Sequence, residues 1–173
     1  MVPFAFLIVL LAFAGVVILS IRAWLRWRGT RLVSCPETGQ PVAVAISTSS
    51  SMLTALGGPL QLSQCSRWPE RQHCGQECLG QIEAAPESCL VRNILACWYR
   101  GKSCVYCGRP LEAHTLEHKP CLLSPAQHTL EWKEVVPEQI PQVLATHRPV
   151  CWNCHISETF RRQFPDLVTD REN

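Results

Sequence analysis

Two short cysteine motifs stand out in the second half of the chain. Cys104 and Cys107 form one pair, Cys151 and Cys154 form another, and two residues separate the cysteines of each pair. This gap lets both thiolates point into the inside of one backbone turn, so that two turns supply the four ligands of a tetrahedral ion. The spacing therefore predicts a closed four-thiolate metal centre, for which Zn²⁺ is the first choice because it uses all four sulfurs.

The second pair also allows haem chemistry, because His155 follows it directly. Cys151, Cys154 and His155 spell the signature of c-type haem attachment, in which the cysteines bind the vinyl groups and the histidine binds iron. An iron–sulfur centre or a redox dithiol is a further alternative. Haem would leave Cys104 and Cys107 without a role, so the sequence favours zinc. In that case His155 is not a ligand and is expected to be free to lie exposed.

A second group of cysteines precedes these pairs. Cys74 and Cys78 are four residues apart and would share one face of a helix. Cys35 and Cys65 stand at the ends of predicted strands. Together the four predict a second metal site, with Cys89 as a spare ligand, although buried or disulfide-paired cysteines are an equal alternative.

The first 21 residues contain no charged side chain, and residues 4–19 are almost wholly apolar. A bilayer's hydrocarbon core requires roughly 20 such residues, so residues 1–28 are predicted to be a single transmembrane anchor. Tryptophans and arginines follow the apolar run, which places the N-terminus outside and the remaining chain in the cytoplasm. These residues are Trp24, Trp27, Arg22, Arg26, Arg28 and Arg31.

This topology affects how the 11 cysteines are interpreted. A reducing cytosol favours metal thiolates over disulfides, and haem is attached outside the cytoplasm. An odd number of cysteines also fits metal ligands plus free thiols. Cys97 and Cys121 lack a partner motif and are interpreted as core thiols.

Charge and motif content narrow the function. Once the four membrane-proximal arginines are set aside, the remaining domain is slightly acidic, which argues against nucleic-acid binding. The sequence shows no nucleophile with a base, no phosphate loop and no paired-carboxylate site. It therefore predicts a non-enzymatic module that contacts an unidentified protein partner, for example as an accessory subunit of a membrane complex.

Residues 102–160 resemble the zinc-ribbon and treble-clef proteins. The resemblance rests on the two C-x-x-C pairs and on Gly108, which follows the first pair where the backbone turns with positive φ. It implies a zinc knuckle held by Cys104, Cys107, Cys151 and Cys154.

Apolar periodicity predicts an α+β fold with a lobe over residues 29–101 and a second over 102–173. Each lobe is small enough to need added cross-links. Residues 47–58 and the segment holding His114 and His118 are predicted loops. The expected strands are near 31–35, 42–46, 60–65, 121–123 and 129–132, and the expected helices are at 86–101, 137–146 and 156–164.

Overall fold

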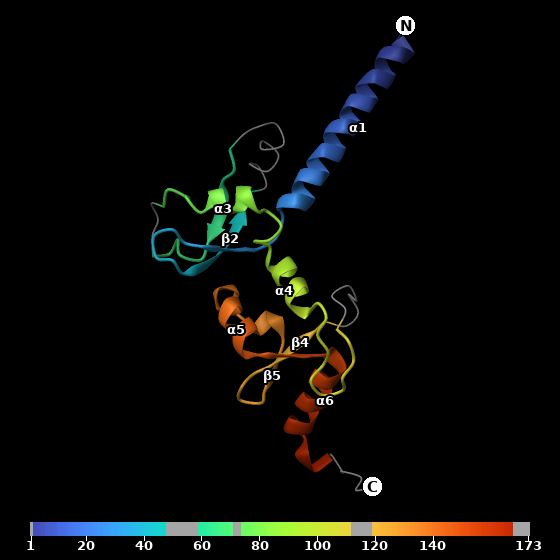
Figure 1. The fold of residues 1–173 in the computed structure, drawn as a ribbon. Coiled ribbons are helices and arrows are strands. Elements are labelled where there is room, and N and C mark those ends of the chain that lie inside the picture. Colours follow the sequence, from blue (N-terminus) through green and yellow to red (C-terminus); the bar gives the residue numbers. More distant parts are fainter. Residues whose placement is uncertain (1, 48–58, 71–73, 112–118, 168–173) are drawn as a thin grey trace. The chain divides into compact units, whose positions relative to one another are not determined.

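The computed structural model describes residues 2–47, 59–70, 74–111 and 119–167 (Figure 1). They contain helices and two antiparallel three-stranded sheets, which confirms the α+β class. The chain divides into two compact units, Met1–Val91 (unit 1) and Arg92–Asn173 (unit 2). The lobes expected at 29–101 and 102–173 stay a prediction. Residues 48–58 of the loop expected at 47–58, and the segment with His114 and His118, lie outside the described residues.

Unit 1 begins with a long apolar helix, α1, over Val2–Trp27. Its segment Phe6–Trp27 has 22 residues and a mean hydropathy of 2.6. At 1.5 Å per residue this segment is roughly 33 Å long, close to the thickness of a bilayer's hydrocarbon core. Its large apolar side chains between Phe6 and Leu25 are exposed. Among the described residues, α1 is the helix long and apolar enough to cross a membrane.

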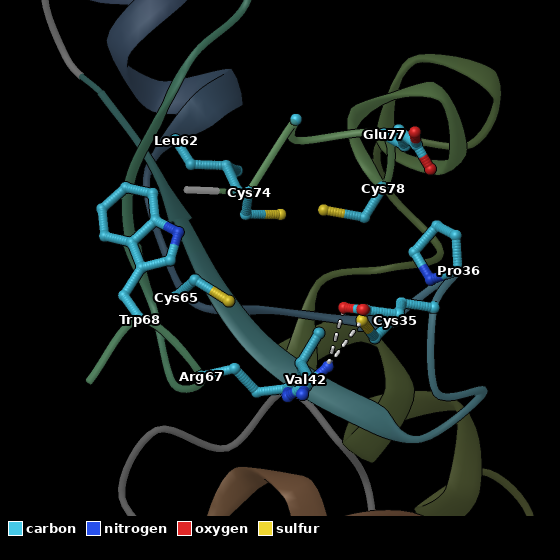
Figure 2. A pocket seen from close by; sticks show the side chains of 12 residues that line it. Cys35, Pro36, Val42, Leu62, Cys65, Arg67, Trp68, Cys74, Glu77 and Cys78 are labelled. Carbon is cyan, nitrogen blue, oxygen red and sulfur yellow. Dashed lines mark hydrogen bonds and ion pairs between the residues drawn. The ribbon is translucent and has the colours of Figure 1, made fainter. Parts of the chain in front are cut away.

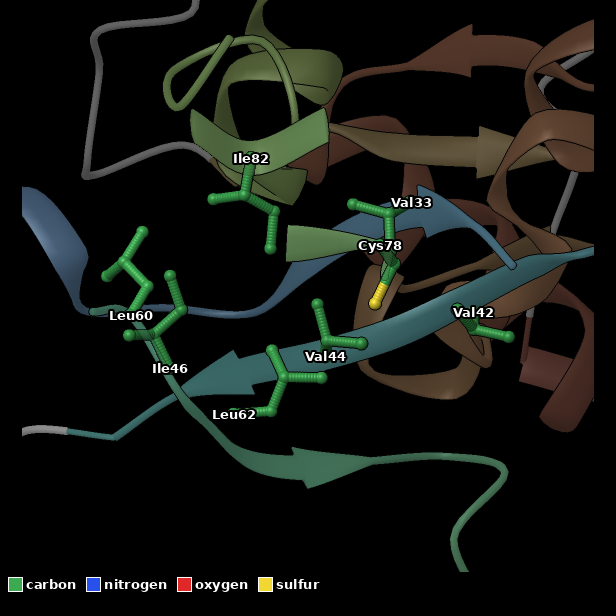
Figure 3. Packing of buried hydrophobic residues seen from close by; sticks show 8 residues of the cluster. All are labelled: Val33, Val42, Val44, Ile46, Leu60, Leu62, Cys78 and Ile82. Carbon is green, nitrogen blue, oxygen red and sulfur yellow. The ribbon is translucent and has the colours of Figure 1, made fainter. Parts of the chain in front are cut away.

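The sheet of unit 1 consists of β1 (Arg31–Ser34), β2 (Pro41–Ile46) and β3 (Leu62–Cys65), in that order. Burial alternates along β2, as a strand with one covered face requires. The short helix α3 (Leu79–Ala84) contributes Ile82 to the covered side. Figure 3 shows this core, whose buried members are Val33, Val42, Val44, Ile46, Leu60, Leu62, Cys78 and Ile82.

A buried arginine joins α1 to this sheet. Arg31, the first residue of β1, is fully buried. Its guanidinium donates hydrogen bonds to the carbonyl oxygens of Trp27 at 2.6 Å and Arg26 at 2.9 Å. These carbonyls lack partners within the helix because they belong to its last turn. Arg31 also forms an isolated β-bridge with Leu90, while Gly29 turns the chain at φ +106°.

Unit 2 surrounds a sheet of order β5-β4-β6, in which β4 pairs antiparallel with both neighbours. Its strands are β4 (Cys121–Leu123), β5 (Thr129–Leu130) and β6 (Arg148–Val150). The helix α4 (Val91–Tyr99) belongs to unit 2 except for its first residue. The other helices of unit 2 are α5 (Ile140–Thr146) and α6 (Trp152–Gln163), with 3₁₀ turns at Trp132–Glu134, Pro137–Gln139 and Pro165–Leu167.

Two helices begin at residues other than those predicted from the sequence. The helix expected from residue 86 begins at Val91. The helix expected at 156 begins at Trp152, immediately after its N-cap residue Cys151. The second difference matters for the site, because it places the second cysteine pair at the start of α6.

An aromatic cluster supports the sheet of unit 2. Tyr99 is buried, donates its hydroxyl to the Cys121 carbonyl at 2.8 Å and accepts a hydrogen bond from the Trp132 indole at 2.9 Å. Trp98 donates to the Leu144 carbonyl at 3.0 Å. Because each polar tip has a partner, these rings can be packed inside the unit without an unsatisfied hydrogen-bonding group.

Candidate metal centre

The structure brings the two C-x-x-C pairs together. Cys104 and Cys107 lie in the turn that is closed by the isolated bridge between Ser103 and Pro110. Cys151 is the N-cap residue of α6 and Cys154 lies in its first turn. The four sulfurs all lie within 4.8 Å of one another.

The spacing of the sulfurs fits a metal ion better than a disulfide. The Sγ atoms of Cys107 and Cys151 are 3.7 Å apart. A disulfide needs about 2.05 Å. Zinc–sulfur bonds of about 2.3 Å in a tetrahedron place neighbouring sulfurs about 3.8 Å apart. The donor set and this distance therefore both fit a four-thiolate ion.

The backbone around the first pair has the form of a knuckle. The N–H of Gly108 donates to the Cys104 carbonyl at 2.9 Å, and the N–H of Cys104 donates to the Arg109 carbonyl at 2.9 Å. Gly108 has φ +70°, a left-handed conformation that favours glycine. This confirms the turn that the sequence predicted for Gly108.

The pKa values of Cys104 and Cys154 are shifted in opposite directions. Burial acts to raise the pKa of the Cys104 thiol, but N–H groups of Cys151, Cys107 and Tyr106 point at its sulfur and lower that pKa to about 6. Burial raises the pKa of Cys154, and the sulfurs of Cys151, Cys107 and Cys104 raise it further. A cation among the four sulfurs would offset this mutual repulsion, since metal binding requires the ligands to be thiolates.

His155 is not the exposed residue that the zinc interpretation of the sequence expected. Its side chain is buried, with its ring centroid 5.4 Å from that of Trp152 and its Nε2 3.9 Å from Oε1 of Glu131. Within the described part of the chain, no hydrogen-bond partner is found for its buried Nδ1. The expectation failed because α6 starts at Trp152 and turns this position toward the sheet. Sequence reasoning also missed Glu131, which has no motif around it.

The second group of cysteines lines one cavity of about 300 Å³ in unit 1. Cys35 follows β1 and Cys65 ends β3, as predicted. Cys74 and Cys78 do not share a helical face, because Cys74 lies in coil and Cys78 precedes α3. The helix starts too late to include Cys74.

Electrostatic interactions connect Cys78 with the other three cysteines of this cavity. Burial raises the pKa of the Cys78 thiol, and the nearby sulfurs of Cys65, Cys74 and Cys35 raise it further. The pKa of Cys35 is lowered, first by the backbone N–H and then by the hydroxyl of Thr38.

The remaining cysteines have separate positions. Cys121 is buried, which confirms its assignment as a core thiol, whereas Cys97 is exposed on α4 and its assignment as a core thiol was wrong. Cys97 lies outside the apolar period of α4, which could have revealed its exposure. Cys89 packs against the core of unit 1, with its Sγ 3.8 Å from the Gln81 carbonyl oxygen.

Comparison with known proteins adds no assignment. No family model, no curated protein and no solved structure matches the chain. The function must therefore be argued from these residues.

Proposed function

We propose that this protein is a membrane-anchored metal-binding module in which Cys104, Cys107, Cys151 and Cys154 hold a structural zinc ion. One observation carries the proposal: the four sulfurs lie within 4.8 Å of one another. A closed set of four thiolates leaves no open coordination position for a substrate, which is the arrangement of structural rather than catalytic zinc.

Haem and iron–sulfur chemistry fit this arrangement less well. The sulfurs of Cys151 and Cys154 face those of Cys104 and Cys107, whereas haem attachment would direct them to a porphyrin. A four-cysteine iron–sulfur cluster remains the competing use of the same ligands.

The membrane anchor in this proposal is α1. Its apolar side chains are exposed, and aromatic and basic residues gather at its C-terminal end. The Arg28 guanidinium lies 4.7 Å from the ring centroid of Trp24, and that of Arg26 lies 5.3 Å from the ring centroid of Trp27. This belt is typical of a cytoplasmic membrane interface, so we propose that the domain faces the cytosol.

The proposed module acts by presenting a surface to a protein partner. Ile156, Phe160 and Phe164 recur every four residues along α6 and its end, and all three are exposed. The rings of Phe160 and Phe164 lie 5.1 Å apart, so they form one continuous apolar stripe. Such a stripe on a polar helix is suited to contact with another protein, as in an accessory subunit of a membrane complex.

The decisive experiment combines elemental analysis with absorption spectroscopy on the full-length protein in lipid nanodiscs. We expect a colourless protein that contains zinc, and we expect Cys154→Ser to lose the zinc of this centre while Cys97→Ser keeps it. Bands of haem or of an iron–sulfur cluster would replace the proposal with electron transfer.

Topology requires its own test, because the cytosolic thiol chemistry depends on it. A C-terminal green fluorescent fusion should be bright and a C-terminal alkaline phosphatase fusion inactive. The opposite pattern would place the cysteines in an oxidising compartment and favour disulfides or haem.

A further inference from the structure

The turn between β1 and β2 repeats the knuckle backbone of the metal centre. The N–H of Cys35 donates to the Gln40 carbonyl at 2.8 Å, and the N–H of Gly39 donates to the Cys35 carbonyl at 2.8 Å. The corresponding two bonds around Cys104 are each 2.9 Å. Gly39 has φ +68°, against +70° for Gly108. Both units therefore contain the same five-residue turn, closed by a left-handed glycine.

The two turns differ at one position. Thr38 stands where the first centre has Cys107, and its backbone N–H and hydroxyl both hydrogen-bond the Cys35 sulfur. The turn thus supplies one sulfur rather than two. A four-ligand site built on it needs three more ligands from other segments.

Three further cysteines face the same cavity. Figure 2 shows the sulfurs of Cys74 and Cys78 pointing toward one another, with that of Cys65 directed at the same space. Cys35 also lines this cavity. None of these cysteines is in a disulfide. A strand turn, a strand end, a coil and a helix start thus each bring one cysteine to this cavity, although the four sulfurs are not grouped as closely as those of the first centre.

The surroundings of these sulfurs suit thiolates. The N–H of Gln76 donates to Sγ of Cys74 at 3.4 Å, and the guanidinium of Arg67 donates to Sγ of Cys35 at 3.2 Å. Gln76 has φ +57°, which is unfavourable for a side-chain-bearing residue. Its side-chain oxygen also accepts a hydrogen bond from the Leu62 N–H at 2.9 Å, which holds it in place. Four thiolates around a divalent ion leave a net charge of about −2, which such donors stabilise.

We propose that Cys35, Cys65, Cys74 and Cys78 bind a second metal ion, a single thiophilic divalent cation such as Zn²⁺, in unit 1. The site is independent of the first centre, since it uses none of the same residues. Its turn supplies the backbone geometry of a zinc knuckle, and the cavity supplies the remaining ligands. Its role is structural, because all four ligands come from the protein.

Thiol protection tests the site without changing a ligand. Cys74 and Cys97 are both exposed, so that only metal binding should distinguish them. Full-length protein in nanodiscs, loaded with Zn²⁺ under reducing conditions, is treated with N-ethylmaleimide and read residue by residue by mass spectrometry. We expect Cys74 to react about tenfold or more slowly than Cys97, and a chelator to abolish the difference. Equal rates in the presence of Zn²⁺ would overturn the proposal.

Metal counting separates the two centres. We expect two zinc ions per chain in the wild type and in Cys97→Ser, and one in each of Cys78→Ser and Cys154→Ser. A single ion in the wild type that is lost in Cys154→Ser would reject the second site and keep the first. An iron–sulfur absorbance lost only in Cys78→Ser would also reject the mononuclear site. If Cys78→Ser fails to fold, the alkylation rates of the wild-type protein decide.

Discussion

The two units contain the same glycine-closed turn, but they differ in the buried residues that surround their cysteines. In unit 1 Cys78 belongs to a core of eight buried residues, and the other seven are aliphatic. In unit 2 the buried cluster at the metal centre has five members, and three of these are cysteines. Sulfur thus takes the place of hydrocarbon in the cluster around the metal centre of unit 2. A metal ion is therefore expected to matter more for the folding of unit 2 than for that of unit 1.

Metal removal is the strongest test of this difference. Structural zinc contributes on the order of 10 kcal/mol, comparable to the whole stability of a small domain. Exhaustive chelation under reducing conditions should unfold unit 2, whereas the sheet of unit 1 should keep part of its protection. Hydrogen exchange of peptides from β4 and from β2 measures the two separately. An equal loss of hydrogen-exchange protection in both units would contradict the comparison. If neither unit lost protection, the metal would have no structural role.

Substituting His155 should affect unit 2 next most strongly. The ring is buried between Trp152 and Glu131, so His155→Ala should lower the free energy of unfolding by about 2 kcal/mol. It should leave the zinc content unchanged, because the four thiolates remain. Chemical denaturation and elemental analysis measure the two effects.

The exposed His128 supplies the control for this substitution. His128→Ala should leave both the free energy of unfolding and the zinc content unchanged. Loss of zinc in His155→Ala alone would make His155 part of the metal centre and reopen the haem interpretation.

Removing the hydroxyl of Tyr99 should have a smaller effect on the free energy of unfolding. This hydroxyl donates to the Cys121 carbonyl and accepts from the Trp132 indole, so Tyr99→Phe leaves two groups without a partner. The bond to the Cys121 carbonyl is buried and that from the Trp132 indole is part-buried, so we expect a loss of about 1–3 kcal/mol in thermal or chemical unfolding. Tyr106 is 44% exposed, and Tyr106→Phe should be nearly neutral. Similar losses for both variants would show that the buried network does not stabilise unit 2.

The smallest expected effects concern the two turn glycines. Gly39→Ala and Gly108→Ala should each cost about 1–2 kcal/mol, because both positions require left-handed backbone. Nothing lies within 4 Å of a Cβ at either position, so the cost is conformational rather than steric. Gly80→Ala, in α3, should instead stabilise slightly. If only Gly108→Ala were destabilising, the two turns would not be equivalent.

The sequence predicted the features that depend on local pattern. The cysteine spacing identified the four sulfurs that the fold brings together, and the run of apolar residues identified α1. The burial of His155 depends on the register of α6 and on Glu131, which is distant in the sequence. The shared knuckle was also missed, because Thr38 interrupts the C-x-x-C pattern while the backbone hydrogen bonds persist.

The buried Arg31 has a mechanical consequence. Only residues 28–30 separate α1 from β1, and the Arg31 side chain spans them by hydrogen-bonding the last carbonyls of the helix. A Cβ at Gly29 would lie 3.4 Å from the Leu90 side chain, so Leu90 also lies beside this joint. The hydrogen bonds of Arg31 hold the end of α1 directly against the start of the sheet, so the two are not joined by a flexible linker. A bilayer that set the tilt of α1 would set the angle of the sheet as well.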